Sequence, residues 1–99
     1  MEVSFQKHKL AQFCSNNKIY RLALFGSALR GELKPDSDID LLVEFKKGHV
    51  PGFFELYRME TELAEMFGGR KIDLRTPAEL SRHFREDVIS GSEVLYSEA

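Results

Sequence analysis

The stretch Leu22-Ala-Leu-Phe-Gly-Ser-Ala-Leu-Arg-Gly-Glu-Leu-Lys-Pro-Asp-Ser-Asp-Ile-Asp-Leu-Leu-Val-Glu-Phe45 decides how this chain folds. It opens with an apolar run, Leu22 to Phe25, which predicts a strand that is buried on both faces. The run breaks at Gly26-Ser27, and a short polar connection follows. A second apolar run then begins with two carboxylates. We therefore expect two strands of one sheet, with polar groups gathered where the connection joins them.

The two carboxylates are Asp38 and Asp40. From Asp38 to Phe45 apolar residues recur at every second position, which is the pattern of a strand. Residues i and i+2 of a strand share a face, so these carboxylates stand roughly 6.5–7 Å apart. At an effective dielectric near 20 they repel by roughly 2–3 kcal/mol. Mg²⁺, which prefers oxygen ligands, would relieve that repulsion. The alternative is the acidic, solvated outer face of an edge strand.

The connection between the strands carries groups suited to phosphate. Gly26 lets a ligand approach the backbone closely. Ser27 can cap a helical turn or donate its hydroxyl to a phosphate, and the free amides after it form an anion site. Arg30, one turn further on, can add a charged fork. The alternative is an ordinary strand–turn–helix junction, in which Gly-Ser is common.

A third carboxylate, Asp73, lies in Lys71-Ile-Asp-Leu-Arg-Thr76. Ile72 and Leu74 alternate with the charged residues, so Asp73 shares a face with Lys71 and Arg75. If this strand lies beside the one that begins at Asp38, Asp73 completes a three-carboxylate cluster. The alternative is a surface aspartate in salt bridges with Lys71 and Arg75.

Gly-Ser, ten residues, Asp-x-Asp and a later aspartate on a strand resemble the DNA-polymerase-β-like nucleotidyltransferase superfamily. The length and the phrases around Phe25-Gly-Ser and Ser37-Asp-Ile-Asp resemble its minimal (MNT) members. The resemblance runs from about residue 19 to the C-terminus. It implies two Mg²⁺ ions, ATP as substrate, and roles for six residues. These are the metal-binding and catalytic Asp38, Asp40 and Asp73, and the nucleotide-binding Gly26, Ser27 and Arg30.

Where many members carry Arg-Ala in the connection, this chain has Ala28-Leu29. Arg30 is then the only cation before the second Gly, and this bears on nucleotide affinity. By the same resemblance, the chain transfers AMP from ATP to a tyrosine hydroxyl of a HEPN-type toxin and so acts as its antitoxin. The runner-up is a non-catalytic antitoxin that neutralises its partner by occlusion. A free-standing enzyme acting on RNA or a small molecule is favoured less.

The composition limits the number of domains and the classes of partner. The 99 residues make one domain, residues 1–99, and 42% hydrophobic with 30% charged residues is typical of a soluble globule. A net charge of −2 argues against a dedicated nucleic-acid surface. The lone Cys14 excludes an internal disulfide and fits the reducing cytoplasm. No apolar stretch reaches the length of a membrane span or matches a signal peptide. Homo-oligomerisation stays open.

The fold expected is α/β (α+β): a small mixed sheet with helices on one face, in the order α-β-β-α-β-α. The helices are expected over residues 4–16, 53–67 and from Thr76 to Gly91, the last with a break near residues 81–83. Strands are expected over residues 20–25, 39–45 and 71–75, and a short extended segment over residues 93–96. In the second helix, one apolar face is expected, made of Phe53, Leu56, Tyr57, Leu63, Ala64 and Phe67. Such an arrangement leaves the acidic face of the sheet open to a ligand.

Overall fold

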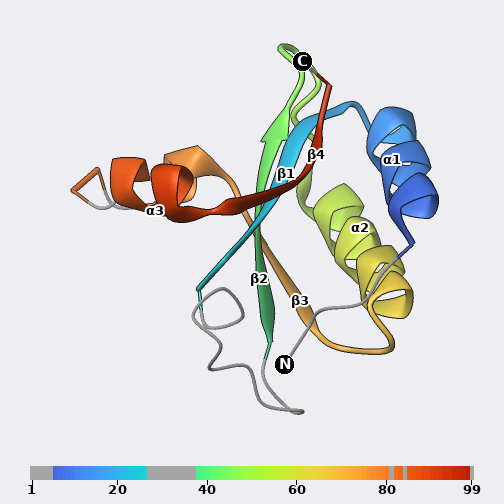
Figure 1. Ribbon diagram of the computed structural model, residues 1–99. Helices are drawn as coiled ribbons and strands as arrows, with labels where there is room; N and C mark the ends of the chain where they lie inside the picture. Colours follow the sequence, from blue (N-terminus) through green and yellow to red (C-terminus); the bar gives the residue numbers. More distant parts are fainter. Residues whose placement is uncertain (1–5, 27–37, 81, 84, 99) are drawn as a thin grey trace.

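The computed structural model describes residues 6–26, 38–80, 82–83 and 85–98. Their elements are, in chain order, α1 (Lys7–Asn16), β1 (Ile19–Phe25), β2 (Ile39–Phe45), α2 (Phe53–Met66), β3 (Ile72–Arg75), the 3-10 turn η2 (Pro77–Glu79), α3 (Arg85–Gly91) and β4 (Glu93–Ser97). The sheet has the order β3-β2-β1-β4, with β3 parallel to β2 and the other pairs antiparallel (Figure 1). The mixed α/β fold is confirmed, and the expected extended segment is a full fourth strand beside β1.

The hydrophobic core lies between the sheet and the two helices α1 and α2, which stand on the same side of the strands (Figure 1). Alternate strand residues point into it, as the period of two predicts. From the helices it receives Leu10, Phe13 and Cys14 of α1 and Met59 and Leu63 of α2. The strands contribute Ile19, Leu22, Leu24, Ile39, Leu41, Val43, Ile72 and Leu74. One continuous core therefore holds the sheet and both helices together.

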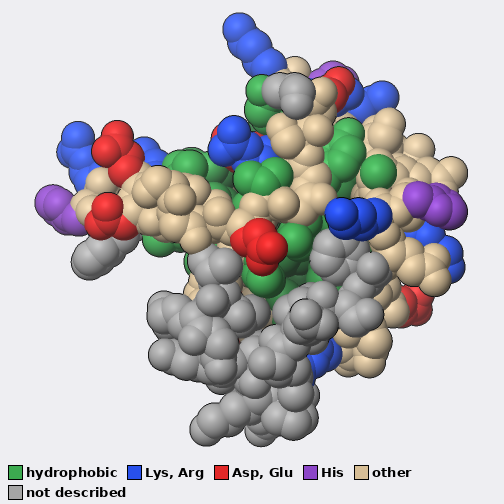
Figure 2. Space-filling view, viewed as in Figure 1, with side chains coloured by type: hydrophobic (Ala, Val, Ile, Leu, Met, Phe, Trp, Pro, Cys, Tyr) green, Lys and Arg blue, Asp and Glu red, His purple; other side chains and the backbone are tan. Residues whose placement is uncertain are grey.

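The second face of the sheet is less open than expected. Ala23 and Leu42, which are register partners on β1 and β2, are 0% and 1% exposed although they point away from the main core. Next to them Arg21 and Glu44 form a cross-strand pair at 3.5 Å. The short helix α3 stands on the side of the strands opposite α1 and α2, so the helices do not all cover one face (Figure 1). In the same view, apolar side chains are visible at the surface between the strands and α3 (Figure 2).

The first helix is shorter than expected. Gln6 is extended, with φ −92° and ψ 117°, so the helix begins at Lys7 and a start at residue 4 is wrong. Residues 4 and 5 themselves lie outside the described part of the chain. At its other end, Asn17 caps the helix as its side-chain amide donates to the Phe13 carbonyl at 2.8 Å.

The expected apolar face of α2 is also wrong in two residues. Met59 and Leu63 are buried, and Phe67 is buried just after the helix. Phe53 and Tyr57 are instead 90% and 61% exposed. Their spacing matches a helical stripe, but with 100° per residue Tyr57 lies about 200° round the helix from Met59. Two apolar stripes on one helix cannot both face the sheet.

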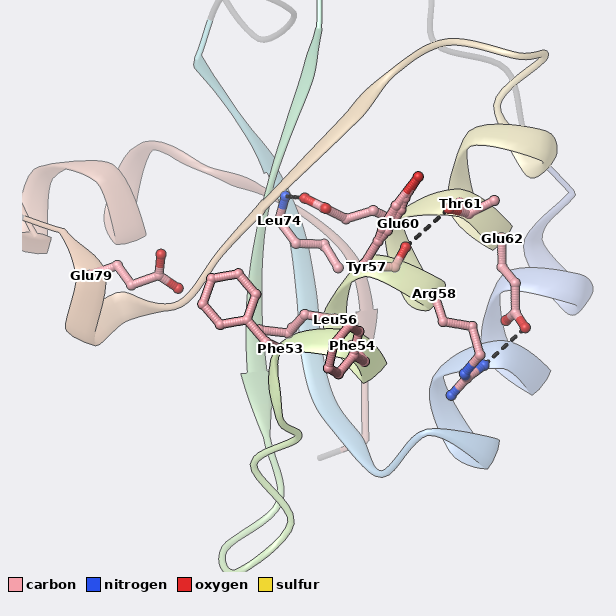
Figure 3. Close-up of a pocket in the computed structure, with 10 residues that line it drawn as sticks. All are labelled: Phe53, Phe54, Leu56, Tyr57, Arg58, Glu60, Thr61, Glu62, Leu74 and Glu79. Atoms are coloured by element: carbon pink, nitrogen blue, oxygen red, sulfur yellow. Dashed lines mark hydrogen bonds and ion pairs between the residues drawn. The ribbon is translucent and has the colours of Figure 1, made fainter.

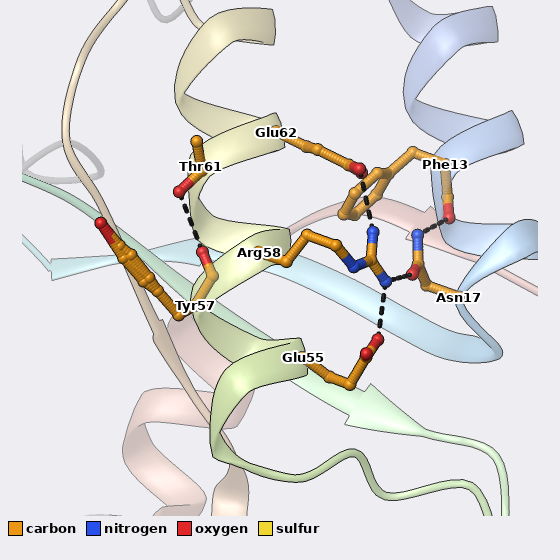
Figure 4. A network of polar contacts seen from close by, with 7 residues as sticks. All are labelled: Phe13, Asn17, Glu55, Tyr57, Arg58, Thr61 and Glu62. Atoms are coloured by element: carbon orange, nitrogen blue, oxygen red, sulfur yellow. Dashed lines mark hydrogen bonds and ion pairs between the residues drawn. The ribbon is translucent and has the colours of Figure 1, made fainter.

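A polar network fastens α2 to the end of α1 (Figure 4). Arg58 donates to Glu55, to Glu62 and to the side-chain oxygen of Asn17, each at 2.9 Å. The hydrogen bond to Glu55 is the first cause, and that to Glu62 the second, of the raised pKa of Arg58. The positive charge of Arg58 is therefore balanced by two carboxylates on its own helix.

The segment after β3 contains the capping box that the sequence predicts. Thr76 donates its hydroxyl to Glu79 at 3.1 Å, and its backbone N–H donates to the same carboxylate at 3.2 Å. The turn nevertheless ends at once, because Leu80 is extended with ψ 146°. The next described helix begins at Arg85, so the break expected near residues 81–83 falls between these two short elements. Among all the described elements, no helix has the length and apolar character needed to cross a membrane.

Candidate functional site

Gly26 ends β1 with a left-handed backbone, at φ +79°. A side chain is disfavoured in this conformation, whereas glycine adopts it readily. The inner side of this turn also faces the Asp40 side chain. A Cβ added at Gly26 would overlap Oδ2 of Asp40 and lie 3.2 Å from its Cγ. The glycine is therefore required here twice, for its φ angle and for the close approach of the Asp40 carboxylate.

Asp40 and Asp73 are register partners on the parallel strands β2 and β3. Paired residues on adjacent strands lie about 4.8 Å apart and share a face. Each is half-buried, on the face opposite Ile39 and Leu41. At ~5 Å and an effective dielectric near 20, two such charges repel by ~3 kcal/mol. The expected neighbourhood of the two aspartates is thus present, and it concentrates negative charge beside Gly26.

Two cations lie near these carboxylates. Arg75 donates to Asp73 at 3.2 Å. This hydrogen bond is the first cause of the raised pKa of the Arg75 guanidinium, and the negative charge of Asp40 also contributes to it. Lys71 pairs with Asp38 at 3.9 Å. Of the two salt bridges that the alternative for Asp73 expects, the one with Arg75 is therefore present, whereas Lys71 pairs with Asp38. Arg75 is a further candidate residue of this site, which the sequence indicates only as a salt-bridge partner of Asp73. Its i+2 spacing from Asp73 was the available signal.

Asp38 lies two residues before Asp40, at the entry to β2, and is exposed. The N–H of the intervening Ile39 donates to the Lys71 carbonyl at 2.9 Å, which extends the ladder to this point. Within the described ranges, no group of three or more His, Cys, Asp or Glu side chains is arranged to hold a metal ion. The predicted phosphate contacts Ser27 and Arg30 lie outside the described residues. The structure thus brings together Gly26, Asp40 and Asp73.

Comparison with protein families gives a match over nearly the whole chain. The family described as "Polymerase beta, Nucleotidyltransferase" matches residues 8–99. A protein of Methanocaldococcus jannaschii named "Putative protein adenylyltransferase" is 44% identical over 59 residues, which are 60% of this chain and 58% of the relative. Protein adenylyltransferase MntA of Thermococcus cleftensis is 33% identical over 78 residues, 79% of this chain and 74% of the relative. The chain thus spans between about half and three quarters of these relatives.

Solved structures share the fold. A chain of a toxin–antitoxin complex with AMP-PNP superposes with a TM-score of 0.72 at 21% identity, covering 93% of this chain and 73% of that one. A chain of a complex between the tri-AMPylated HEPN toxin of Shewanella oneidensis and an MNT antitoxin gives 0.63 at 19% identity, covering 92% and 69%. At these identities the likeness is one of fold.

Proposed function

Because the chain belongs to the polymerase-β nucleotidyltransferase family, we propose that it transfers AMP from ATP to a hydroxyl group of a partner protein. The observation that carries this proposal is the placement of Asp40 beside Asp73 with Gly26 against the Asp40 carboxylate. Half-buried like charges side by side are costly unless a cation is held between them. A backbone turn that admits no side chain leaves room for the phosphates that such a cation would carry.

Mg²⁺ fits this group of residues. It takes one or two protein carboxylates and completes its shell with water and substrate phosphate oxygens, so the pair Asp40 and Asp73 meets its needs. Asp38, at the start of the same strand, would have to leave Lys71 and turn toward this pair to add a third ligand, and the three carboxylates would then hold two ions. When bound, Mg²⁺ neutralises the triphosphate and lowers the pKa of the attacking hydroxyl.

The chain's own residues orient the reactants. Gly26 allows the triphosphate to approach the backbone, and Ser27 and Arg30 are proposed to hold its outer phosphates. Asp73 accepts the proton of the acceptor hydroxyl. The hydroxyl oxygen forms a bond to the α-phosphorus while the bond to pyrophosphate breaks on the opposite side. Arg75, beside Asp73, stays within reach of charge that develops there.

We propose a HEPN-type toxin as the acceptor, with a tyrosine as the modified residue, so that the chain serves as its antitoxin in the cytoplasm. This rests on the relatives named protein adenylyltransferase and on the shared fold with MNT antitoxins. The AMP-PNP in a solved complex of the same fold favours ATP as the donor.

A second candidate, neutralisation by occlusion alone, is favoured by the ion pairs. Arg75 and Lys71 already partner Asp73 and Asp38, so the carboxylates do not need a metal to be accommodated. In this reading the metal site is idle and the chain acts by covering its partner.

Protection of cells that express the partner toxin separates the two candidates. The double variant Asp38→Ala with Asp40→Ala removes two of the proposed ligands. The matched control is Glu86→Ala with Asp87→Ala, which removes two exposed carboxylates from α3. Catalysis predicts that the first variant loses protection while the control keeps it. Full protection by the first variant at normal expression would decide for occlusion.

A further inference from the structure

A groove of about 960 Å³ lies between α2, β3 and η2, and its described lining includes none of Gly26, Asp40 and Asp73 (Figure 3). Its walls are the first three turns of α2 on one side and Leu74 of β3 on the other. Phe53 extends from α2 toward β3, and Glu79 of η2 lies across from it (Figure 3). The nucleotide chemistry proposed above makes no use of this groove.

The groove is rimmed by aromatic side chains that face solvent. Phe53, Phe54 and Tyr57 are 90%, 92% and 61% exposed. Three exposed aromatic residues within two turns of one helix form a contiguous apolar patch, unlike isolated exposed residues, which are common. Contiguous patches with a polar rim mark interaction sites, and aromatic residues there supply large contact areas with few torsions to immobilise.

The rim around this patch is acidic. Glu60, Glu62 and Glu79 line the groove, and Arg58 is the one cation among the described residues that line it. Arg58 pairs with Glu55 and Glu62, and Glu79 pairs with Arg75 at 3.8 Å. Together with Glu60, four carboxylates stand against two arginines, so the rim keeps an excess of negative charge. Glu60 accepts a hydrogen bond from the neutral N–H of Leu74 at 2.9 Å, which leaves its negative charge in place. Basic side chains of a partner would complement this rim and could also stack on the aromatic faces.

The same hydrogen bond decides which secondary structure can enter. β3 is at the edge of the sheet, where an incoming strand could otherwise pair with free backbone groups. Glu60 occupies the outward N–H of Leu74, in the middle of this four-residue strand. An added strand would have to displace this hydrogen bond, so a helix that lays an apolar face into the groove is the better-fitting guest. A second copy of this chain fits poorly, since a symmetric contact would bring the same glutamates together.

From these observations we infer that the α2 groove is a docking surface for an amphipathic helix of a partner protein, with apolar residues on the seated face and Arg or Lys along its edges. The inference goes beyond the proposed function, because docking requires neither nucleotide nor metal. The aromatic residues of α2 anchor the helix, and the glutamates select its flanking charge.

The test uses fluorescence anisotropy of labelled synthetic helices of about five turns, ~18 residues. One carries a leucine face flanked by arginines, and the other has glutamate at each arginine position. We expect the intact chain to bind the arginine peptide at least tenfold more tightly, and to lose affinity as salt rises through the range that screens surface charges. Equal binding of both peptides would overturn the inference.

Variants locate the binding. Phe53→Ser with Phe54→Ser should weaken the arginine peptide at least tenfold, while Val94→Ser, at another exposed apolar position, should not. Glu60→Gln keeps an acceptor for Leu74 N–H and should weaken binding severalfold; Glu65→Gln, on the same helix, is its control. Unchanged binding in the double variant would refute the site.

Two further results complete the test. Asp40→Asn should bind the arginine peptide like the unaltered chain, so that failure of the proposed chemistry and failure of docking can be told apart. Sedimentation of the unaltered chain as a dimer that the double variant at Phe53 and Phe54 dissociates would instead identify a second copy as the occupant.

Discussion

Replacing Gly26 by alanine isolates the contact on which the candidate site rests. Gly68 provides a matched control, because both glycines have φ +79° but a Cβ at Gly68 would meet nothing within 4 Å. The left-handed backbone costs an L side chain about 1–2 kcal/mol at either position. At about 4–8 °C per kcal/mol for a domain of this size, both variants should melt at a lower temperature by about 4–16 °C.

Only Gly26→Ala also displaces the Asp40 carboxylate, with which its new methyl group would overlap. The carboxylate is the end of a short side chain, so its displacement adds little to the loss of stability. A misplacement of ~1 Å at a reacting centre can nevertheless cost ~100-fold in rate. Thermal melts and AMP transfer should therefore separate: both variants are destabilised, and Gly26→Ala alone loses transfer. Equal transfer by the two variants would refute the role given to this contact.

Other properties of the molecule give three further predictions. Leu63→Ala, at a fully buried position of α2, should lower the free energy of unfolding by about 2–5 kcal/mol in urea denaturation, and a loss below 1 kcal/mol would contradict the core described here. Burial raises the pKa of the Cys14 thiol from 9.0 to about 12, so the unfolded chain loses this proton first, and the free energy of unfolding should fall between about pH 9 and 12. Urea titrations across that pH range should show that the free energy of unfolding falls less steeply with pH in Cys14→Ala than in the unaltered chain. An identical dependence on pH in both proteins would contradict the raised pKa of Cys14. Arg75→Gln removes the cation that competes for Asp73, so calorimetry should show Mn²⁺ binding severalfold more tightly; unchanged affinity would exclude such competition.

The sequence predicted the sheet well because the strands carry a strict period of two. Ile39, Leu41 and Val43 are buried on one face, and Asp40 lies on the other. The pairing of Asp40 with Asp73 followed from the same alternation, once the two strands were assumed to be neighbours. The capping box at Thr76 was equally local, since its partners are three residues apart.

What failed required long-range information. Phe53 and Tyr57 are spaced like core residues, but the packing of α2 decides which of its stripes faces the sheet. In the structure, Met59 is buried there and Phe53 and Tyr57 are exposed. The Lys71–Asp38 pair depends on the register between β2 and β3, which no local pattern encodes. The predicted break in the last helix is present, but the element before it is a 3-10 turn of three residues and not a longer helix, although its capping box is complete.

Transfer of AMP to the partner is the claim that most needs a direct measurement. The intact mass of the HEPN-type partner should be recorded after incubation with ATP, Mg²⁺ and the chain, alongside a reaction with Asp73→Asn. Our account predicts that the unaltered chain adds adenylyl groups to the partner, that tyrosine carries them, and that Asp73→Asn and omission of Mg²⁺ each abolish the gain. A partner that is neutralised by the unaltered chain without any gain in mass would contradict it.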